Sequence, residues 1–477
     1  MSRISSNPLV IAISFACASI ALAQSGPITT PATRAPPATT ATPATTATPA
    51  ATATPAATAT PAATAATAAT AATAATTVDP IRVLVGRLDL EKYKSAIKGL
   101  TQFGDRRQGT ARNRAAVDWI EAQLKDYGCT NTSRLQYDYS SSSPRLPSGP
   151  AIAQTPDAAA GGGRYRGTRN RTGVNEDPLR QPDEKLRTLN SEPSVDGPRE
   201  EVYCTKIGST HPEEMYIVGA HMDGIGWGEA ANDDGSGTAL VMELARLLSS
   251  PDVRTERSIR FVFWNNEETG LHGARAYVTQ RAALQGQENP TGSGQYPEPR
   301  WLGMIQHDME LFDHGMPRPD GTVPTQQRPE ADVNLEFQSA ARFADEAEKL
   351  AWAFYAANEA YATDYPAVVG PHMTNTDSTP FMDLVPAISV RENERGREIG
   401  AGWDPHWHQP TDLYATFTDQ DFRLGLNAAQ TTLGAIARLA GARISQQLSP
   451  SSATANVDTP HGRRDAAGGR RRPWRTS

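Results

Sequence analysis

Short apolar runs alternate with segments of helical periodicity between residues 110 and 439, and this alternation constrains the fold more than any other feature. Five runs are predicted as strands because they are short, rich in β-branched and aromatic residues, and bounded by turn residues. These strands cover 201–207, 215–220, 259–264, 301–306 and 387–390, and helices are predicted over 110–127, 238–248, 340–361 and 419–439. The pattern predicts an α/β fold: a three-layer sandwich with a mixed, largely parallel central sheet flanked by helices.

The N-terminal 79 residues have two compositions, neither typical of a folded domain. Residues 1–23 combine an early Arg3, an apolar run and the small-residue triplet Ala21, Leu22, Ala23, which predicts a cleaved secretory signal peptide. A membrane anchor and a lipoprotein anchor at Cys17 are the alternatives. Residues 24–79 are almost entirely Thr, Ala and Pro, which lack the apolar bulk to offset the entropy of ordering, so we predict a disordered stalk.

The remaining chain is predicted to form one domain at 80–448, with a surface insertion at 141–197, followed by a disordered basic tail at 449–477. A net charge of −7 and a pI near 5.8 argue against nucleic acid as a partner. We expect a secreted, periplasmic or cell-envelope protein with no membrane span after signal cleavage, which could associate with the envelope through the stalk or tail. Signal removal leaves Cys129 and Cys204, either as a disulfide or as two buried thiols.

Polar residues of unusual types follow the predicted strands. They are His221 in GAHMDG, Glu267 and Glu268 in FVFWNNEETG, and His307 and Asp308 in IQHDME. Asp233 lies in ANDDGSG before a predicted helix, and His406, His408 and Asp412 lie in DPHWHQPTD. Active groups of open α/β sheets gather beyond the carboxyl ends of strands. Two imidazoles and three carboxylates would suit zinc or a similar divalent ion, and would suffice for two ions that share a carboxylate.

Adjacent carboxylates at the end of a buried strand repel each other, so Glu267 and Glu268 predict a positive charge nearby. One of them could bind a metal while the other takes a proton from water and returns it to a leaving amine. The spacing alone does not decide which carboxylate has which role.

Together these motifs resemble metallopeptidase family twenty-eight, the di-zinc aminopeptidases typified by bacterial leucyl aminopeptidases. The successive segments that carry the resemblance are HMD, DDGSG, EETGLHG, IQHDME and HQPTD. The resemblance implies a zinc exopeptidase-like fold and two zinc ions or similar divalent ions. It implies the following roles: His221 and Asp308 bind one ion, Glu268 and His408 bind the other, Asp233 bridges both, and Glu267 is the general acid/base. Asp223 and Asp412 match carboxylates that orient the ligand imidazoles.

Three features leave alternatives open within the resemblance. His307 and His406 are competing ligands beside the family positions. Trp407 stands where many relatives have tyrosine, so its indole N–H either stabilises an oxyanion or the ring packs as a wall. Gln409 stands where Thr or Ser is common, and we expect no effect because the spacing of His408 and Asp412 is intact.

An exported aminopeptidase that acts on peptide substrates is the main functional hypothesis. A carboxypeptidase or dipeptidase of the same family is the alternative, because Arg391 and Arg395 could neutralise a substrate carboxylate. A one-zinc glutaminyl-cyclase-like enzyme and a non-catalytic surface module are less favoured, because both ligand sets are complete in the sequence.

Overall fold

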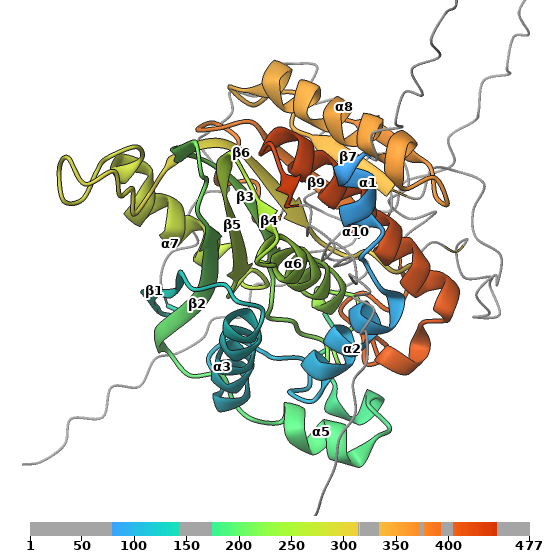
Figure 1. Ribbon diagram of the computed structural model, residues 1–477. Helices are drawn as coiled ribbons and strands as arrows, with labels where there is room; N and C mark the ends of the chain where they lie inside the picture. Colours follow the sequence, from blue (N-terminus) through green and yellow to red (C-terminus); the bar gives the residue numbers. More distant parts are fainter. Residues whose placement is uncertain are drawn as a thin grey trace, which may run out of the picture. The chain divides into compact units, whose positions relative to one another are not determined.

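An eight-stranded mixed sheet forms the centre of the domain, as the sequence predicts (Figure 1). Its strands are β1 (Thr132–Tyr139), β2 (Gly197–Lys206), β3 (His211–His221), β5 (Arg257–Trp264), β6 (Arg300–His307), β7 (Val333–Phe337), β8 (Ala367–Gly370) and β9 (Ala387–Arg391). Their spatial order is β1-β2-β5-β3-β6-β9-β7-β8. The central strands β5, β3, β6 and β9 run parallel, whereas β2 joins β5 and β7 joins β9 in antiparallel pairs. The carboxyl ends of the four central strands therefore lie at one edge of the sheet.

The computed structural model describes residues 79–142, 174–312, 314, 333–371, 376–392 and 404–445. The predicted signal peptide, the stalk up to residue 78 and the predicted basic tail lie outside these ranges, as does much of the predicted insertion. Every described residue belongs to one compact unit that includes 75–477. Within this described part, every helix is too short or too polar to cross a lipid bilayer.

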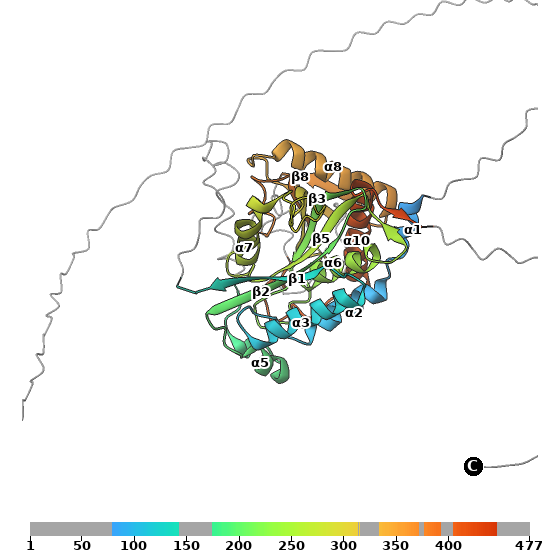
Figure 2. The same ribbon diagram turned by 60° about the vertical axis from the view of Figure 1, so that its left-hand side comes forward.

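Helices cover both faces of the sheet (Figure 2). They are α1 (Pro80–Val85), α2 (Leu90–Thr101), α3 (Ala111–Asp126), α5 (Glu184–Asn190), α6 (Gly235–Leu248), α7 (His272–Arg281), α8 (Ala344–Tyr361) and α10 (Asp419–Leu439). Short 3-10 turns are η2 (Pro178–Arg180), η3 (Ala282–Leu284) and η4 (Tyr414–Thr416), and β4 (Val253–Arg254) pairs with β10 (Arg443–Ile444). The predicted helices correspond to α3, α6, α8 and α10.

Strand β3 shows how the two faces are separated. Successive side chains of a strand point to opposite faces. Val218 and Ala220 pack into a large core with residues of α2, α3, α6, α8 and α10. Met215 and Ile217 pack into a smaller core with Tyr277 of α7. Because α6 lies inside the large core, nearly all of its residues are buried, including polar ones such as Ser236 and Thr238.

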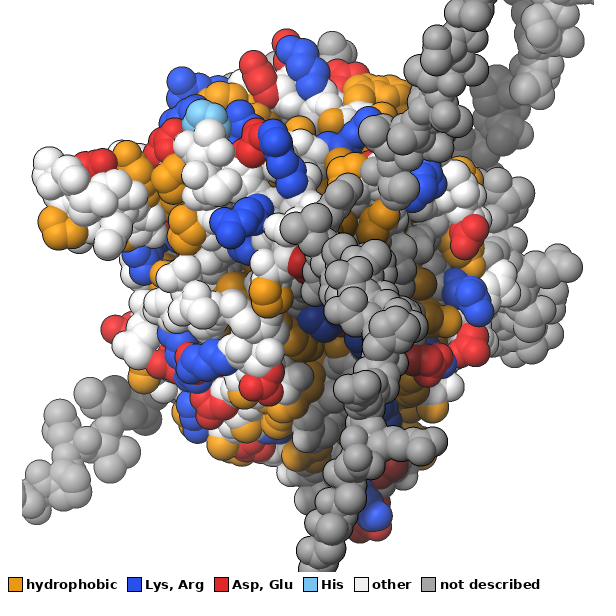
Figure 3. Space-filling view, viewed as in Figure 1, with side chains coloured by type: hydrophobic (Ala, Val, Ile, Leu, Met, Phe, Trp, Pro, Cys, Tyr) orange, Lys and Arg blue, Asp and Glu red, His pale blue; other side chains and the backbone are white. Residues whose placement is uncertain are grey.

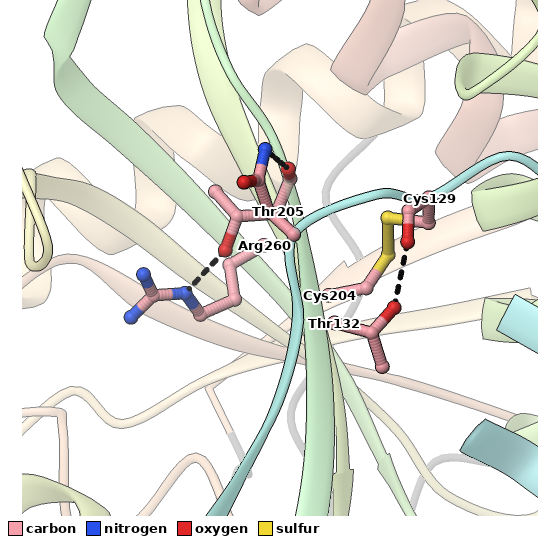
Figure 4. The surroundings of a disulfide bond; sticks show 6 residues. Cys129, Thr132, Cys204, Thr205 and Arg260 are labelled. Carbon is pink, nitrogen blue, oxygen red and sulfur yellow. Dashed lines mark hydrogen bonds between the residues drawn. A yellow bond between two sulfur atoms is a disulfide. The ribbon is translucent and has the colours of Figure 1, made fainter. Parts of the chain in front are cut away.

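Cys129 and Cys204 form a disulfide, which settles the alternative that the sequence left open (Figure 4). The bond joins the loop after α3 to strand β2. Thr132 Oγ1 donates a hydrogen bond of 2.7 Å to the carbonyl of Cys129, which holds this loop at the start of β1.

The described part of the predicted insertion packs against the loops that follow β3 and precede α10. Gln181 Nε2 donates to the carbonyls of Trp227 at 2.8 Å and Pro410 at 2.9 Å. Asn190 Nδ2 donates to the carbonyl of Gly228 at 2.8 Å. Gln181 and Asn190 are buried. Residues 174–197 therefore contact the domain through a few buried side chains, while most of this segment is exposed or half-buried.

Candidate metal centre

The predicted site residues meet beyond the carboxyl edge of the central strands. His221 is the last residue of β3, Asp308 follows β6, and Glu267 and Glu268 follow β5. Parallel neighbours end at the same edge, which is why residues far apart in sequence arrive together. Asp233 lies two residues before α6, and His408 lies in the loop before η4.

His221, Asp233 and Asp308 form a first donor group, and all three are buried. His221 Nε2 lies 3.2 Å from Asp233 Oδ1 and 3.8 Å from Asp308 Oδ1. One nitrogen and two carboxylate oxygens in this arrangement fit the preferences of zinc.

Asp233, Glu268 and His408 form a second donor group. His408 Nε2 lies 3.1 Å from Asp233 Oδ2 and 2.9 Å from Glu268 Oε2. Asp233 presents Oδ1 to the first group and Oδ2 to the second, as expected of a carboxylate that bridges two ions.

The pKa values of the donor groups show that buried negative charge predominates in the site. Burial alone would lower the pKa of both imidazoles, but the neighbouring carboxylates outweigh it. Asp233 and Asp308 raise the pKa of His221 well above its usual value, and Glu268 and Asp233 raise the pKa of His408 to about 10. Conversely, His221 and His408 lower the pKa of Asp233 despite its burial. Glu268 Oε1 is buried without a hydrogen-bond partner among the described residues. A divalent ion in each group would supply the missing positive charge.

Glu267 lies beside the donor groups. Together with His221 and Glu268 it forms a third cluster whose donor atoms lie within 4.8 Å of one another. Its backbone N–H donates to Asp223 Oδ1 at 3.0 Å, and its carbonyl accepts from Gly270 and Leu271. This turn holds the Glu267 carboxylate close to His221 and Glu268, and Glu267 belongs to neither of the two groups that share Asp233.

Asp223 and Asp412 contact the site mainly through hydrogen bonds that involve backbone atoms, which the sequence analysis did not predict. His221 Nδ1 is hydrogen-bonded at 3.0 Å to the backbone carbonyl of Asp223. The carboxylate oxygen Oδ1 of Asp223 lies 4.0 Å from the same nitrogen. Asp412 accepts from the backbone N–H groups of Asn232 at 2.8 Å and Asp233 at 3.1 Å. The expected contact between each carboxylate and an imidazole is thus replaced by contacts with the backbone of the ligand loops.

The two competing histidines lie outside the donor groups. His307 is fully buried between the Gly219 carbonyl, at 3.2 Å, and Thr432 Oγ1, at 2.9 Å. Burial lowers the pKa of His307 to about 4, so the ring is neutral at ordinary pH. The His406 ring is hydrogen-bonded to Thr411 Oγ1 at 2.9 Å.

His408 has an unusual backbone conformation that neighbouring segments hold in place. Its φ of 57° is in the left-handed region, which costs about 1–3 kcal/mol for a residue other than glycine. Asn175 N donates to its carbonyl at 3.0 Å. A Cβ at Gly226 would lie 2.3 Å from the His408 carbonyl carbon, so only glycine allows this approach.

Trp407 and Arg391 both contact metal-ligand candidates directly. The Trp407 ring stacks on the His408 ring with centroids 4.0 Å apart and an interplanar angle of 26°, which agrees with the packing role. Arg391 is buried and forms an ion pair with Asp308 Oδ2. Arg391 is therefore engaged with a ligand carboxylate, and Arg395 lies outside the described residues.

Sequence reasoning missed two buried carboxylates. Asp234 caps α6 and accepts three backbone hydrogen bonds. Asp377 is fully buried, and neither of its carboxylate oxygens has a hydrogen-bond partner in the described part of the chain. Burial and the negative charge of Glu267 raise the pKa of Asp377 well above its usual value. A single Asp in the run TDST carries no periodic signal, so only the three-dimensional arrangement reveals it.

The candidate metal centre is buried, unlike the charged side chains of the exposed surface, and it is distinct from a cavity elsewhere in the domain. Figure 3 shows a face with basic and acidic side chains interspersed, whereas the carboxylates of the site are buried. A cavity of about 570 Å³ lies beside the disulfide, lined by Tyr203, Thr205, Arg260 and Tyr296 among others. Arg260 is already paired with Glu298 and hydrogen-bonded to Thr205, so the cavity has no comparable demand for a ligand.

Residues 202–428, just under half of the chain, match the model of Peptidase family M28. The matched segment contains every member of both donor groups. Residues 202–428 thus match a peptidase family, and the resemblance drawn from the motifs is confirmed for this segment.

Curated relatives match over short stretches. Aminopeptidase YwaD of Bacillus subtilis is 43% identical over 68 residues, which cover 14% of this chain and 14% of that protein. Carboxypeptidase Q of Xenopus laevis is 38% identical over 71 residues, or 15% of each chain. The chain thus spans about a seventh of the length of these relatives. Among solved structures, BSAP, a zinc aminopeptidase from Bacillus subtilis, superposes with a TM-score of 0.49 at 16% identity, covering 74% of this chain and 95% of that one.

Proposed function

We propose that the protein is a di-zinc metallopeptidase that hydrolyses N-terminal peptide bonds. The observation that carries this proposal is the division of five predicted ligands into two donor groups that share Asp233. In this assignment His221 and Asp308 hold one ion, Glu268 and His408 hold the other, and Asp233 bridges them. Zinc bound here would lower the pKa of a coordinated water and polarise the carbonyl of the scissile bond.

The chain's own residues supply the remaining chemistry. Glu267 takes the proton of the attacking water and delivers it to the nitrogen of the leaving amine. Its backbone is held by Asp223, so the carboxylate needs little reorganisation during the reaction. Asp223 and Asp412 hold the ligand loops through backbone contacts, and Trp407 shields one face of the His408 ring.

Aminopeptidase specificity is favoured over carboxypeptidase specificity by the charges around the site. A substrate carboxylate needs an available cation, whereas Arg391 is buried against Asp308. A substrate ammonium needs carboxylates, and both carboxylate oxygens of Asp377 lack a hydrogen-bond partner in the described chain. Burial and Glu267 raise the pKa of Asp377, and an ammonium bound beside it would favour its ionised form. Carboxypeptidase or dipeptidase activity remains the second candidate, supported by the similarity to Carboxypeptidase Q.

The proposal includes export. The composition of residues 1–23 supports a signal peptide, with residues 24–79 as a stalk and 449–477 as a basic tail. The disulfide between Cys129 and Cys204 supports an oxidising compartment, such as the periplasm, the cell envelope or the exterior. Association with the envelope would then depend on the stalk or the tail.

The decisive experiment compares wild type with Glu267→Gln on aminoacyl anilides and on peptides with free or acetylated N-termini. We expect the wild type to cleave free N-termini, to lose activity with a chelator and to regain it with Zn²⁺. The Glu267→Gln variant should lose about 10²- to 10⁴-fold in kcat while it still binds zinc, because it lacks the proton acceptor but keeps both donor groups.

Glu213→Gln provides a matched control, because Glu213 lies at the start of β3, far along the strand from His221. It should leave kcat unchanged. Ordinary turnover by Glu267→Gln would refute the assigned role of Glu267. Cleavage of acetylated peptides from their carboxyl ends would instead support the carboxypeptidase alternative.

A further inference from the structure

Asp234 joins three segments of the metal centre through one buried carboxylate. Its Oδ2 accepts from the backbone N–H of His221 at 3.1 Å. Its Oδ1 accepts from the N–H groups of Gly237 at 2.9 Å and Met309 at 3.2 Å. Asp234 is fully buried, so no water competes for these bonds.

Each of these contacts lies at or next to a member of the first donor group. His221 is itself a member, Met309 follows Asp308, and Gly237 belongs to the helix turn that follows Asp233. The hydrogen bonds of Asp234 within the described residues do not include the second group's Glu268 or His408. Apart from its peptide bond to Asp233, which belongs to both groups, Asp234 therefore contacts segments of the first donor group only.

Asp412 has a complementary set of contacts. Its two carboxylate oxygens accept from the N–H groups of Asn232 and Asp233. Asp233 belongs to both donor groups. A displacement at Asp412 is thus transmitted to both groups through Asp233. Loss of the Asp234 hydrogen bonds instead acts on His221 and on Met309 beside Asp308, and both ligands belong to the first group alone.

We infer that Asp234 is a positioning residue that determines the affinity of the His221–Asp233–Asp308 group independently of the other group. This inference rests on the proposed two-metal function. The carboxylate is required because both of its oxygens accept from N–H donors. An asparagine would turn an N–H₂ group toward either His221 or the Gly237 and Met309 pair, and would lose hydrogen bonds on that side.

The test is calorimetric titration of metal-free protein with Zn²⁺, using wild type, Asp234→Asn and Asp412→Asn. Wild type should bind two ions. Asp234→Asn should bind one ion as wild type does and the other at least about tenfold more weakly, whereas Asp412→Asn should weaken both. Asp89→Asn is the control, because Asp89 also caps a helix, α2, but lies outside both donor groups, and it should leave the binding of both ions unchanged.

Gly237→Ala tests the same contact if Asp234→Asn does not fold. A Cβ at Gly237 would lie 2.5 Å from Asp234 Oδ1, so it would displace the carboxylate without changing its charge. We expect the same one-sided loss of affinity. Equal weakening of both ions, or of neither, by Asp234→Asn and Gly237→Ala would overturn the inference. A wild type that binds no zinc would instead overturn the proposed function and this inference with it.

Discussion

At the residue scale, Trp407 can pack against a neighbouring ring as a tyrosine would, but it has no hydroxyl group to stabilise an oxyanion. The family resemblance implies a tyrosine with a hydroxyl group at this position, whereas Trp407 stacks on the His408 ring. Stacking restricts the rotation of an imidazole that must present Nε2 to Glu268 and Asp233. Packing is therefore the role that the geometry supports for Trp407.

This role predicts a difference between two substitutions. Trp407→Phe keeps an aromatic face and should change kcat by less than about threefold, whereas Trp407→Ala should weaken zinc binding by about tenfold or more. Steady-state kinetics and zinc titration would measure both effects. If Trp407→Phe lowered kcat as much as loss of an oxyanion donor does, about 10²-fold, the indole N–H would be the important group.

At the scale of elements, the disulfide connects a helix to the sheet. Cys129 follows α3 and Cys204 lies in β2, 75 positions later in the sequence. Both side chains are buried. The bond therefore limits the unfolded chain chiefly by closing a long loop, while in the folded domain α3 and β2 also touch through the large core.

Removing the disulfide should lower the free energy of unfolding without altering the metal centre. For a loop of this length, the Cys129→Ala, Cys204→Ala double variant should lose about 2–4 kcal/mol. Urea unfolding would measure this loss, with reduced wild type as a comparison. Zinc stoichiometry and kcat of the folded variant should equal those of wild type, and an unchanged unfolding midpoint would contradict the prediction.

At the scale of the whole molecule, burial of carboxylates makes global stability depend on pH. Glu201 in β2 is fully buried, and burial raises its pKa well above the usual 4.5, more than the backbone of Asn265 lowers it. Because the folded state holds this proton more tightly than the unfolded state, the associated stability is present below pH 4.5. It is lost as the pH rises toward the folded-state pKa.

Glu201→Gln should therefore gain stability relative to wild type as the pH rises. At pH 4 the two proteins should have similar free energies of unfolding, whereas at pH 8 the variant should be more stable by more than about 1 kcal/mol, since each unit of pKa shift is worth about 1.4 kcal/mol. Urea unfolding at several pH values would measure the difference. A difference that is constant with pH would show that Glu201 is ionised in the folded state.

Much of the fold and the site could be predicted from local patterns. Apolar runs located the central strands, because buried parallel strands are hydrophobic on both faces. The edge strand β1 has only Leu135 buried, so it lacked an apolar run. Helix α7 has only Gly273, Ala274 and Tyr277 buried, so it gave little periodic signal. His221, Asp233, Glu268, Asp308 and His408 were located because strand ends and short motifs are local features, and the structure brings them into two groups.

The sequence by itself determined the α/β class and predicted the candidate donor residues, since both follow from short motifs and local patterns in the chain. Only the tertiary structure decided that Cys129 and Cys204 are bonded, that His307 faces Thr432, and that Arg391 pairs with Asp308. It also decided that Asp412 supports Asp233 and not the His408 ring. These contacts join residues 75 to 179 positions apart in the sequence. Each of these side chains could pair with many others of the same type, and the packing of the fold decides which pair forms.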